Sequence, residues 1–214
     1  MKMNEEVKNV VVIMGDPTKQ DPIKPGNIFD EDDQETVDKL KYALKELNGY
    51  HFIYLNNHDI LFDRLKKLSE SADIHLVLNL CDEGFNNDPT KELNIPVMLE
   101  MLDLPYTGAS SICLAYCYDK SAVKSIARKM GIPVAEGFLI NSDNMQIPNI
   151  TFPVIIKPNF GDGSFGITKD SIIYSIEELH SAISQMRKKF NYHKSVLVEK
   201  FIDVGVTKIV IALS

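Results

Sequence analysis

The segment 154–166 combines a lysine with a glycine-rich loop, a pattern suited to binding phosphate. A short apolar run ends at Lys157, and Pro158 stops the strand that this run predicts. Three glycines follow close together: Gly161, Gly163 and Gly166. Glycines let backbone N–H groups approach an anion closely, because they lack Cβ and tolerate positive φ. Lys157 would add a compact positive charge to such a phosphate cradle.

An ordinary glycine-rich hairpin with a surface lysine would give the same short pattern. The strand pattern resumes at Ile167 and Thr168, so two strands joined by a glycine-rich turn are expected. The segment is not a P-loop, which needs Gly-Lys-Ser/Thr. It is not a Rossmann fingerprint either, which needs a helix after the last glycine. The rest of the chain therefore has to distinguish the cradle from the hairpin.

The composition indicates a globular protein with an acidic balance. Of its 214 residues 44% are apolar and 25% charged, and the formal charge is −7. This charge disfavours nucleic acid as a partner, and no apolar run is long enough for a membrane span. The start of the chain has no apolar signal region and the three cysteines are an odd number, so a reduced, cytoplasmic protein is expected. Cys113 and Cys117 are interpreted as buried thiols rather than a metal or redox pair.

The first part of the chain predicts a parallel α/β sheet. Strands expected at 7–14, 51–55 and 74–80 alternate with helical spacing between them, as in right-handed βαβ units. Two further apolar helices are expected at 95–102 and 110–118, the second of them buried. Ligands of parallel sheets bind beyond the carboxyl ends of the strands. The candidate substrate residues are the acids that follow those ends: Asp16, Asp82 and Glu83.

The second part predicts an antiparallel α+β layout. Asp119 can cap a helix at 120–130, and one domain is expected to end near this residue. After this helix we expect, in chain order, a strand at 134–140, the glycine hairpin, a helix at 176–189 and a strand at 195–200. Leu179, Ile183 and Met186 give the last helix its inner face.

Taken together, four segments resemble the ATP-grasp ligases, most closely the D-alanine–D-alanine ligase branch. They are LEMLDLPYTG at 99–108, YDK at 118–120 with Lys124, VIIKPNFGDGSFG at 154–166 and LVEKFI at 197–202. The match covers about residues 75–202. It implies an α/β fold in which a parallel-sheet, Rossmann-like pre-ATP-grasp domain spans 1–118. An α+β ATP-grasp subdomain would follow at 119–202, and a truncated C-terminal subdomain would begin at 203–214.

The resemblance also implies roles for single residues. Lys120 and Lys157 would contact the ATP phosphates. The loop over the β and γ phosphates would be formed by Gly163, Ser164 and Gly166. The adenine would meet the strand end formed by Glu199, Lys200, Phe201 and Ile202. No catalytic or metal-ligating residue is assigned.

The implied activity is an ADP-forming ligation of a carboxylate to an amine through an acyl phosphate. ATP and Mg²⁺ are the implied cofactors, an amino acid or peptide the small-molecule substrate, and a homodimer is compatible with the family. Three departures matter. The family's metal-binding acids lie in a C-terminal part that this sequence lacks, 205–207 carries no ribose-binding acid, and the loop at 15–18 lacks the usual serine and glutamate. The 214-residue chain is therefore expected to be inactive. A ligase for another amino acid or peptide and an inactive nucleotide-binding remnant remain open alternatives.

Overall fold

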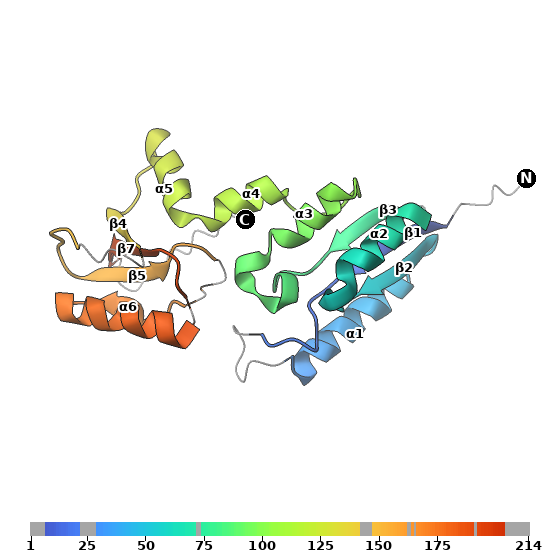
Figure 1. Ribbon diagram of the computed structural model, residues 1–214, viewed down its shortest axis with the longest axis horizontal. Coiled ribbons are helices and arrows are strands. Elements are labelled where there is room, and N and C mark those ends of the chain that lie inside the picture. Colours follow the sequence, from blue (N-terminus) through green and yellow to red (C-terminus); the bar gives the residue numbers. More distant parts are fainter. Residues whose placement is uncertain are drawn as a thin grey trace, which may run out of the picture. The chain divides into compact units, whose positions relative to one another are not determined.

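The computed structural model describes residues 7–21, 29–71, 74–141, 147–161, 164, 166–190 and 192–203. The chain divides into two compact units, Met1–Ala115 and Tyr116–Ser214, which are described separately (Figure 1). The boundaries expected at 118 and 202 remain a prediction, and residues 204–214 lie outside the described ranges. Within those ranges no helix is both long and apolar enough to cross a membrane.

The first unit is built on a three-stranded parallel sheet in the order β2-β1-β3. Its strands are β1 (Lys8–Ile13), β2 (Tyr50–Leu55) and β3 (Ile74–Asn79). Val11 in the central strand pairs with Ile53 and Val77, and four consecutive residues of β1 are buried. Burial on both faces explains the continuous apolar run, as in other parallel sheets. The predicted α/β fold is confirmed.

This unit also contains the helices α1 (Glu31–Lys45), α2 (Leu61–Ser71) and α3 (Asn94–Met101) and the start of α4 (Ser111–Tyr118). Short 3₁₀ turns η2 (His58–Ile60), η3 (Phe85–Asn87) and η4 (Pro89–Lys91) lie in its loops. The core joins α2 and α3 to the sheet through Leu61, Leu65, Ile95 and Leu99. Because β1 and β3 are adjacent and parallel, the loops that follow them leave the sheet at the same edge.

Two expectations about α4 are wrong. The helix was expected to be buried, but Ile112 is 69% exposed and only Tyr118 is buried. Cys113 and Cys117 are both exposed rather than buried thiols. An apolar helix would gain from burial, but it becomes buried only where another part of the protein packs against it.

The second unit contains a four-stranded antiparallel sheet in the order β4-β7-β5-β6. Its strands are β4 (Gly137–Ile140), β5 (Val154–Pro158), β6 (Ile172–Ile173) and β7 (Val196–Lys200). Helix α6 (Ile176–Phe190) packs on one face through Leu179, Ile183 and Met186, which confirms the predicted inner face. Helix α5 (Lys120–Lys129) lies on the other side of this sheet (Figure 1).

The glycine-rich hairpin exists, but its second strand starts later than expected. Ile155 pairs with Ile172, so the chain returns at β6 and not at Ile167. The 3₁₀ turn η5 (Lys169–Ser171) precedes β6. Thr168 Oγ1 accepts the Asp170 N–H at 3.2 Å, and Ser171 Oγ accepts the Thr168 N–H at 2.9 Å. These side-chain hydrogen bonds favour a capped turn over a continued strand.

Candidate functional site

Glu199 lies between two lysines near the end of β7. Its carboxylate accepts hydrogen bonds from Lys124 Nζ on α5 and, at 2.7 Å, from Lys157 Nζ on β5. The Glu199 side chain is only 8% exposed. Burial by itself would raise the pKa of Glu199, but the hydrogen bonds and charges of the two lysines outweigh it and hold this pKa below its ordinary value. An ionised carboxylate therefore binds two ammonium groups on one side of the sheet.

The sequence predicts no role for Lys124, which pairs with Glu199 in the structure. Lys124 belongs to the same motif as YDK at 118–120, but only Lys120 is predicted to contact the nucleotide. The available signal was the spacing: residues four apart on a helix lie on the same face, one turn from each other. Lys124 thus reaches Glu199 from the same helix that carries Lys120.

The N-terminus of α5 is fixed against the start of the glycine loop. Lys120 Nζ donates a hydrogen bond to the carbonyl of Gly161, and the Lys120 N–H donates to the carbonyl of Asn159 at 3.1 Å. Asp119 caps the helix as predicted, because its Oδ1 accepts the Ala122 N–H at 3.0 Å. Lys120 is therefore held at the start of the glycine loop.

The described part of the loop has a backbone suited to an anion. Gly161, Ser164 and Gly166 have φ values of 116°, 64° and 70°. Positive φ costs a glycine little, but for Ser164 it costs about 1–3 kcal/mol. Such strain at a non-glycine residue is typical of functional loops. Gly163, the third predicted glycine of the cradle, lies outside the described residues.

Two backbone N–H groups of the strand end predicted to meet adenine are already hydrogen-bonded to backbone carbonyls. The Lys200 N–H donates to the Glu136 carbonyl at 2.8 Å, and the Phe201 N–H donates to the Pro153 carbonyl at 3.0 Å. Ile202 is 60% exposed. These two N–H groups are therefore not available to adenine, which would have to be bound by other groups of this segment.

A cavity of about 260 Å³ lies beside this strand end. Its wall includes Glu136, Gly137, Glu199, Lys200 and residues 148–151. Its volume is close to the lower end of the range for small-molecule sites. Gly137 allows β4 to approach β7, because a Cβ at this position would lie 2.4 Å from the carbonyl oxygen of Val198.

In the first unit, Asp16 is buried and bonded by its own neighbours. Its Oδ1 accepts hydrogen bonds from the N–H and the hydroxyl of Thr18 at 2.9 and 2.7 Å, and its Oδ2 accepts the His58 N–H at 2.8 Å. Burial works against ionisation, but these bonds together hold the pKa of Asp16 below its ordinary value. The carboxylate therefore organises the loop after β1.

The other two predicted substrate acids are placed differently. Asp82 is exposed, whereas Glu83 is half-buried with its carboxylate against Gly15. A Cβ on Gly15 would lie 2.7 Å from Glu83 Cδ, so a larger residue at position 15 would displace the Glu83 carboxylate. Of the two acids that follow β3, Glu83 is the one that lies against the loop after β1.

A buried histidine at this edge was missed by the sequence reading. His58 Nδ1 accepts the Asn86 N–H at 2.7 Å, and Nε2 lies 3.1 Å from the Met14 carbonyl, to which it donates in the matching tautomer. Burial lowers the pKa of His58, which keeps the ring neutral. One isolated histidine in the sequence gave no signal for this role.

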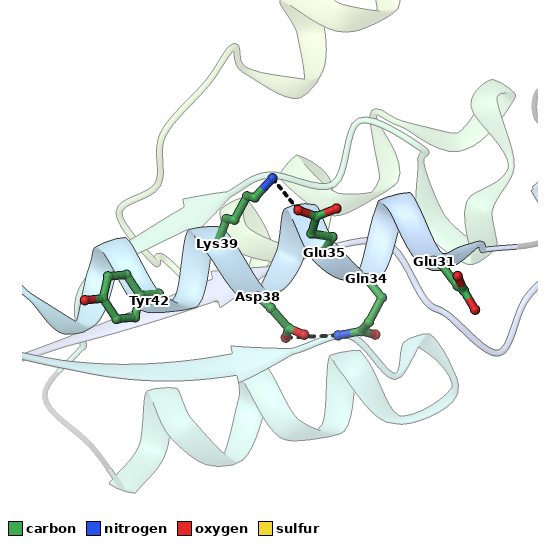
Figure 2. A pocket seen from close by; sticks show the side chains of 6 residues that line it. All are labelled: Glu31, Gln34, Glu35, Asp38, Lys39 and Tyr42. Carbon is green, nitrogen blue, oxygen red and sulfur yellow. Dashed lines mark hydrogen bonds and ion pairs between the residues drawn. The ribbon is translucent and has the colours of Figure 1, made fainter.

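A hollow of about 760 Å³ along α1 does not resemble a nucleotide site. Figure 2 shows its side chains on one exposed helix: Glu31, Gln34, Glu35, Asp38, Lys39 and Tyr42. Lys39 Nζ is paired with Glu35 at 2.6 Å, and Gln34 Nε2 donates to Asp38 at 3.0 Å. Three carboxylates against one lysine would repel a triphosphate.

Within the described ranges, no three His, Cys, Asp or Glu side chains come together as a metal site. Mg²⁺ needs several oxygen ligands in near-octahedral geometry. No Mg²⁺ ligand is therefore assigned among the described residues.

Comparison with known proteins gives independent findings. Residues 119–208 match the family model for the carbamoyl-phosphate synthase L chain, ATP binding domain. Over 197 residues the chain is 27% identical to the D-alanine–D-alanine ligase of Bacillus anthracis, and the match covers 89% of this chain and 56% of that ligase. The chain thus spans little more than half the length of this relative.

Solved structures agree in fold. The D-alanine–D-alanine ligase from Bacillus anthracis complexed with ATP aligns with a TM-score of 0.59 at 24% identity, over 91% of this chain and 59% of that one. The VanG D-Ala:D-Ser ligase from Enterococcus faecalis aligns with a TM-score of 0.65 at 17% identity, over 92% and 63%.

Proposed function

We propose that the chain is a member of the ATP-grasp, D-alanine–D-alanine ligase-like family and carries nucleotide-binding residues of an ATP-dependent carboxylate–amine ligase. One observation carries this proposal. Helix α5, strand β5 and the start of the glycine loop bring Lys120, Lys124 and Lys157 together around Glu199 and Gly161. Two of these ammonium groups share the single carboxylate of Glu199, so a phosphate would meet an excess of positive charge there.

The lysines and the loop would hold the phosphates. Lys120 and Lys157 supply charge-assisted hydrogen bonds, which are about twice as strong as neutral ones. The loop residues with positive φ, Ser164 and Gly166 among them, would present backbone N–H groups. Phosphoryl transfer depends mainly on such positioning and on offsetting the charge of the transferred group.

Glu199 would have two functions in this site. Its carboxylate pairs with Lys124 and Lys157 and would orient both side chains before a nucleotide arrives. A carboxylate beside the 260 Å³ cavity can also accept a hydrogen bond from the exocyclic amine of adenine. The phosphates would then take over part of the pairing of Lys157.

The proposed reaction has two steps. ATP transfers its terminal phosphoryl group to a substrate carboxylate oxygen, which forms an acyl phosphate and ADP. The amine of the second substrate attacks the acyl carbon, the C–O bond to phosphate breaks, and phosphate leaves as the new amide forms. The residues described above would bind and orient the nucleotide for the first step.

A ligase for another amino acid or peptide is the second candidate. It is favoured by the loop after β1, where Asp16 is bonded to Thr18 and His58 instead of facing a substrate. Glu83 and Asp82 then remain as the proposed contacts for a substrate amine. Calorimetric titration of the chain with a panel of amino acids and dipeptides, which needs no turnover, tests this: binding of D-alanine alone contradicts the second candidate.

Calorimetric titration with ADP and ATP tests nucleotide binding directly. We expect binding by the wild-type chain and a loss of more than a hundredfold in Lys120→Met/Lys157→Met, since each contact contributes about 1.5–3 kcal/mol. The control, Lys129→Met/Lys188→Met, removes the same charge from exposed residues of α5 and α6. A wild-type chain that binds neither nucleotide, or equal losses in both variants, would reject the proposal.

A further inference from the structure

We propose that Asn159 is a positioning residue that fixes Lys120 beside the glycine loop; the inference rests on the proposed nucleotide site. Asn159 lies immediately after Pro158, where β5 ends and the loop begins. The residue belongs to the glycine-rich segment, but the sequence predicts no role for it. The position is 1% exposed, so its side chain does not contact solvent.

Four polar groups of Asn159 are hydrogen-bonded. Its side-chain Oδ1 accepts the Ser121 N–H at 3.0 Å, and its Nδ2 donates to Asp119 Oδ1 at 2.9 Å. Its carbonyl accepts the Lys120 N–H, and its own N–H donates to the Ser195 carbonyl, both at 3.1 Å. The N-cap residue Asp119 and the first two residues of α5 are thus bonded to one asparagine.

This contact anchors the start of α5 to the end of β5. None of the ten residues of the helix is buried, so apolar packing holds it weakly. The backbone bridge between Asp119 and Phe160 joins the same two segments. Buried polar groups that are all paired specify one geometry, because any other arrangement leaves a buried group unsatisfied.

The geometry of Lys120 follows from this anchor. Its Nζ already points to the Gly161 carbonyl, two residues after Asn159 along the loop. A displaced helix start would move Nζ away from the loop without altering the lysine itself. Positioning errors of about 1 Å are enough to weaken a phosphate contact markedly.

Exchanging the two partners separates this role from general stability. Asn159→Asp puts a second carboxylate 2.9 Å from Asp119, which disfavours the pair. Adding Asp119→Asn restores one amide and one carboxylate with the wild-type charge, and asparagine caps helices as well as aspartate does. Asn141→Asp is the control, because Asn141 is exposed. Its Oδ1 accepts a hydrogen bond from Ser195 Oγ, and aspartate keeps this oxygen.

Two readouts are measured on the full chain: hydrogen exchange of the peptide 119–124 and ADP affinity by calorimetry. We expect Asn159→Asp to speed exchange in this peptide and to weaken ADP binding about tenfold, a change of 1.36 kcal/mol. The exchanged double variant should recover both, and Asn141→Asp should match the wild type. In a Lys120→Met background, Asn159→Asp should cost no further affinity, as expected for residues acting through one another.

Unchanged exchange in Asn159→Asp, no recovery in the double variant, or an equal loss in the Lys120→Met background would each overturn the inference. If Asn159→Asp does not fold, the double variant decides alone: it must show wild-type exchange and affinity. A wild-type chain without ADP binding would reject the proposed function, and the exchange data would still decide whether Asn159 positions α5.

Discussion

The Nζ atom of Lys157 lies 2.7 Å from Oε2 of Glu199, so this lysine already has a carboxylate partner on its own sheet. The same carboxylate is bonded to Lys124 from α5. A nucleotide phosphate must therefore compete with Glu199 for Lys157 or share it. The pairing also orients the lysine in advance, which reduces the side-chain entropy lost on binding.

Replacing Lys157 should weaken nucleotide binding more than it weakens the fold. Lys157→Met removes a charge-assisted phosphate contact that contributes about 1.5–3 kcal/mol, which corresponds to roughly 10- to 150-fold in affinity. Calorimetric titration with ADP measures this loss. Lys169→Met, at an exposed residue of η5 in the same unit, is the control and should bind as the wild type does. Equal affinities of the wild type and Lys157→Met would remove Lys157 from the site.

Replacing Lys124 should lower the stability of the second unit. Lys124→Met leaves Glu199 with one partner instead of two while it remains 8% exposed. The expected loss is about 1–3 kcal/mol in the free energy of unfolding by urea. Lys129→Met, on the exposed last turn of the same helix, should change stability by less than about 0.5 kcal/mol. If both variants unfold at the same urea concentration, the Lys124–Glu199 pair contributes nothing.

Asp16 should behave as a structural residue of the first unit. Asp16→Asn replaces an acceptor by an NH₂ group that faces the donors of Thr18 or His58. A buried donor without an acceptor should cost about 2–4 kcal/mol of unfolding free energy. Asp82→Asn, at an exposed position, should be neutral in the same urea titration. A neutral Asp16→Asn would instead favour the role in substrate binding that the sequence indicated.

Much of the framework could be predicted from the sequence because its signals are local. The continuous apolar run before Gly15 indicates a strand buried on both faces, and Asp119 before a helical pattern indicates an N-cap. The motif around Lys157 placed one lysine next to the glycine loop. These features depend on a few neighbouring residues, which the chain order displays directly.

The missing parts depend on which distant segments meet. Lys124 and Glu199 are 75 positions apart, and no pattern within either segment indicates their pairing. The same holds for Asn159, whose side chain bonds residues about 40 positions earlier. The exposed thiols of α4 were misjudged for the opposite reason: their apolar neighbours are a local signal, but burial requires a partner surface.

The pH dependence of stability should identify the Glu199 carboxylate. Its pKa in the folded protein lies below the ordinary value of 4.5, so its contribution is fully present above about pH 5 and is lost as the pH falls through the folded-state pKa. Glu199→Gln cannot ionise and leaves Lys124 and Lys157 without a counter-charge at any pH. The wild type should therefore be more stable than the variant at pH 7, and the difference should shrink toward pH 3.5.

Urea titrations of both proteins at pH 7, 5, 4 and 3.5 measure this difference. Asp119 and Asp16 also have lowered pKa values, so both proteins should lose stability in acid. Subtracting the Glu199→Gln curve from the wild-type curve removes that shared part and leaves the contribution of Glu199. The expected difference at pH 7 is about 1–3 kcal/mol, because one carboxylate bonds two ammonium groups in a largely buried position. A difference that stays constant from pH 7 to 3.5 would mean that Glu199 contributes through its shape rather than its charge.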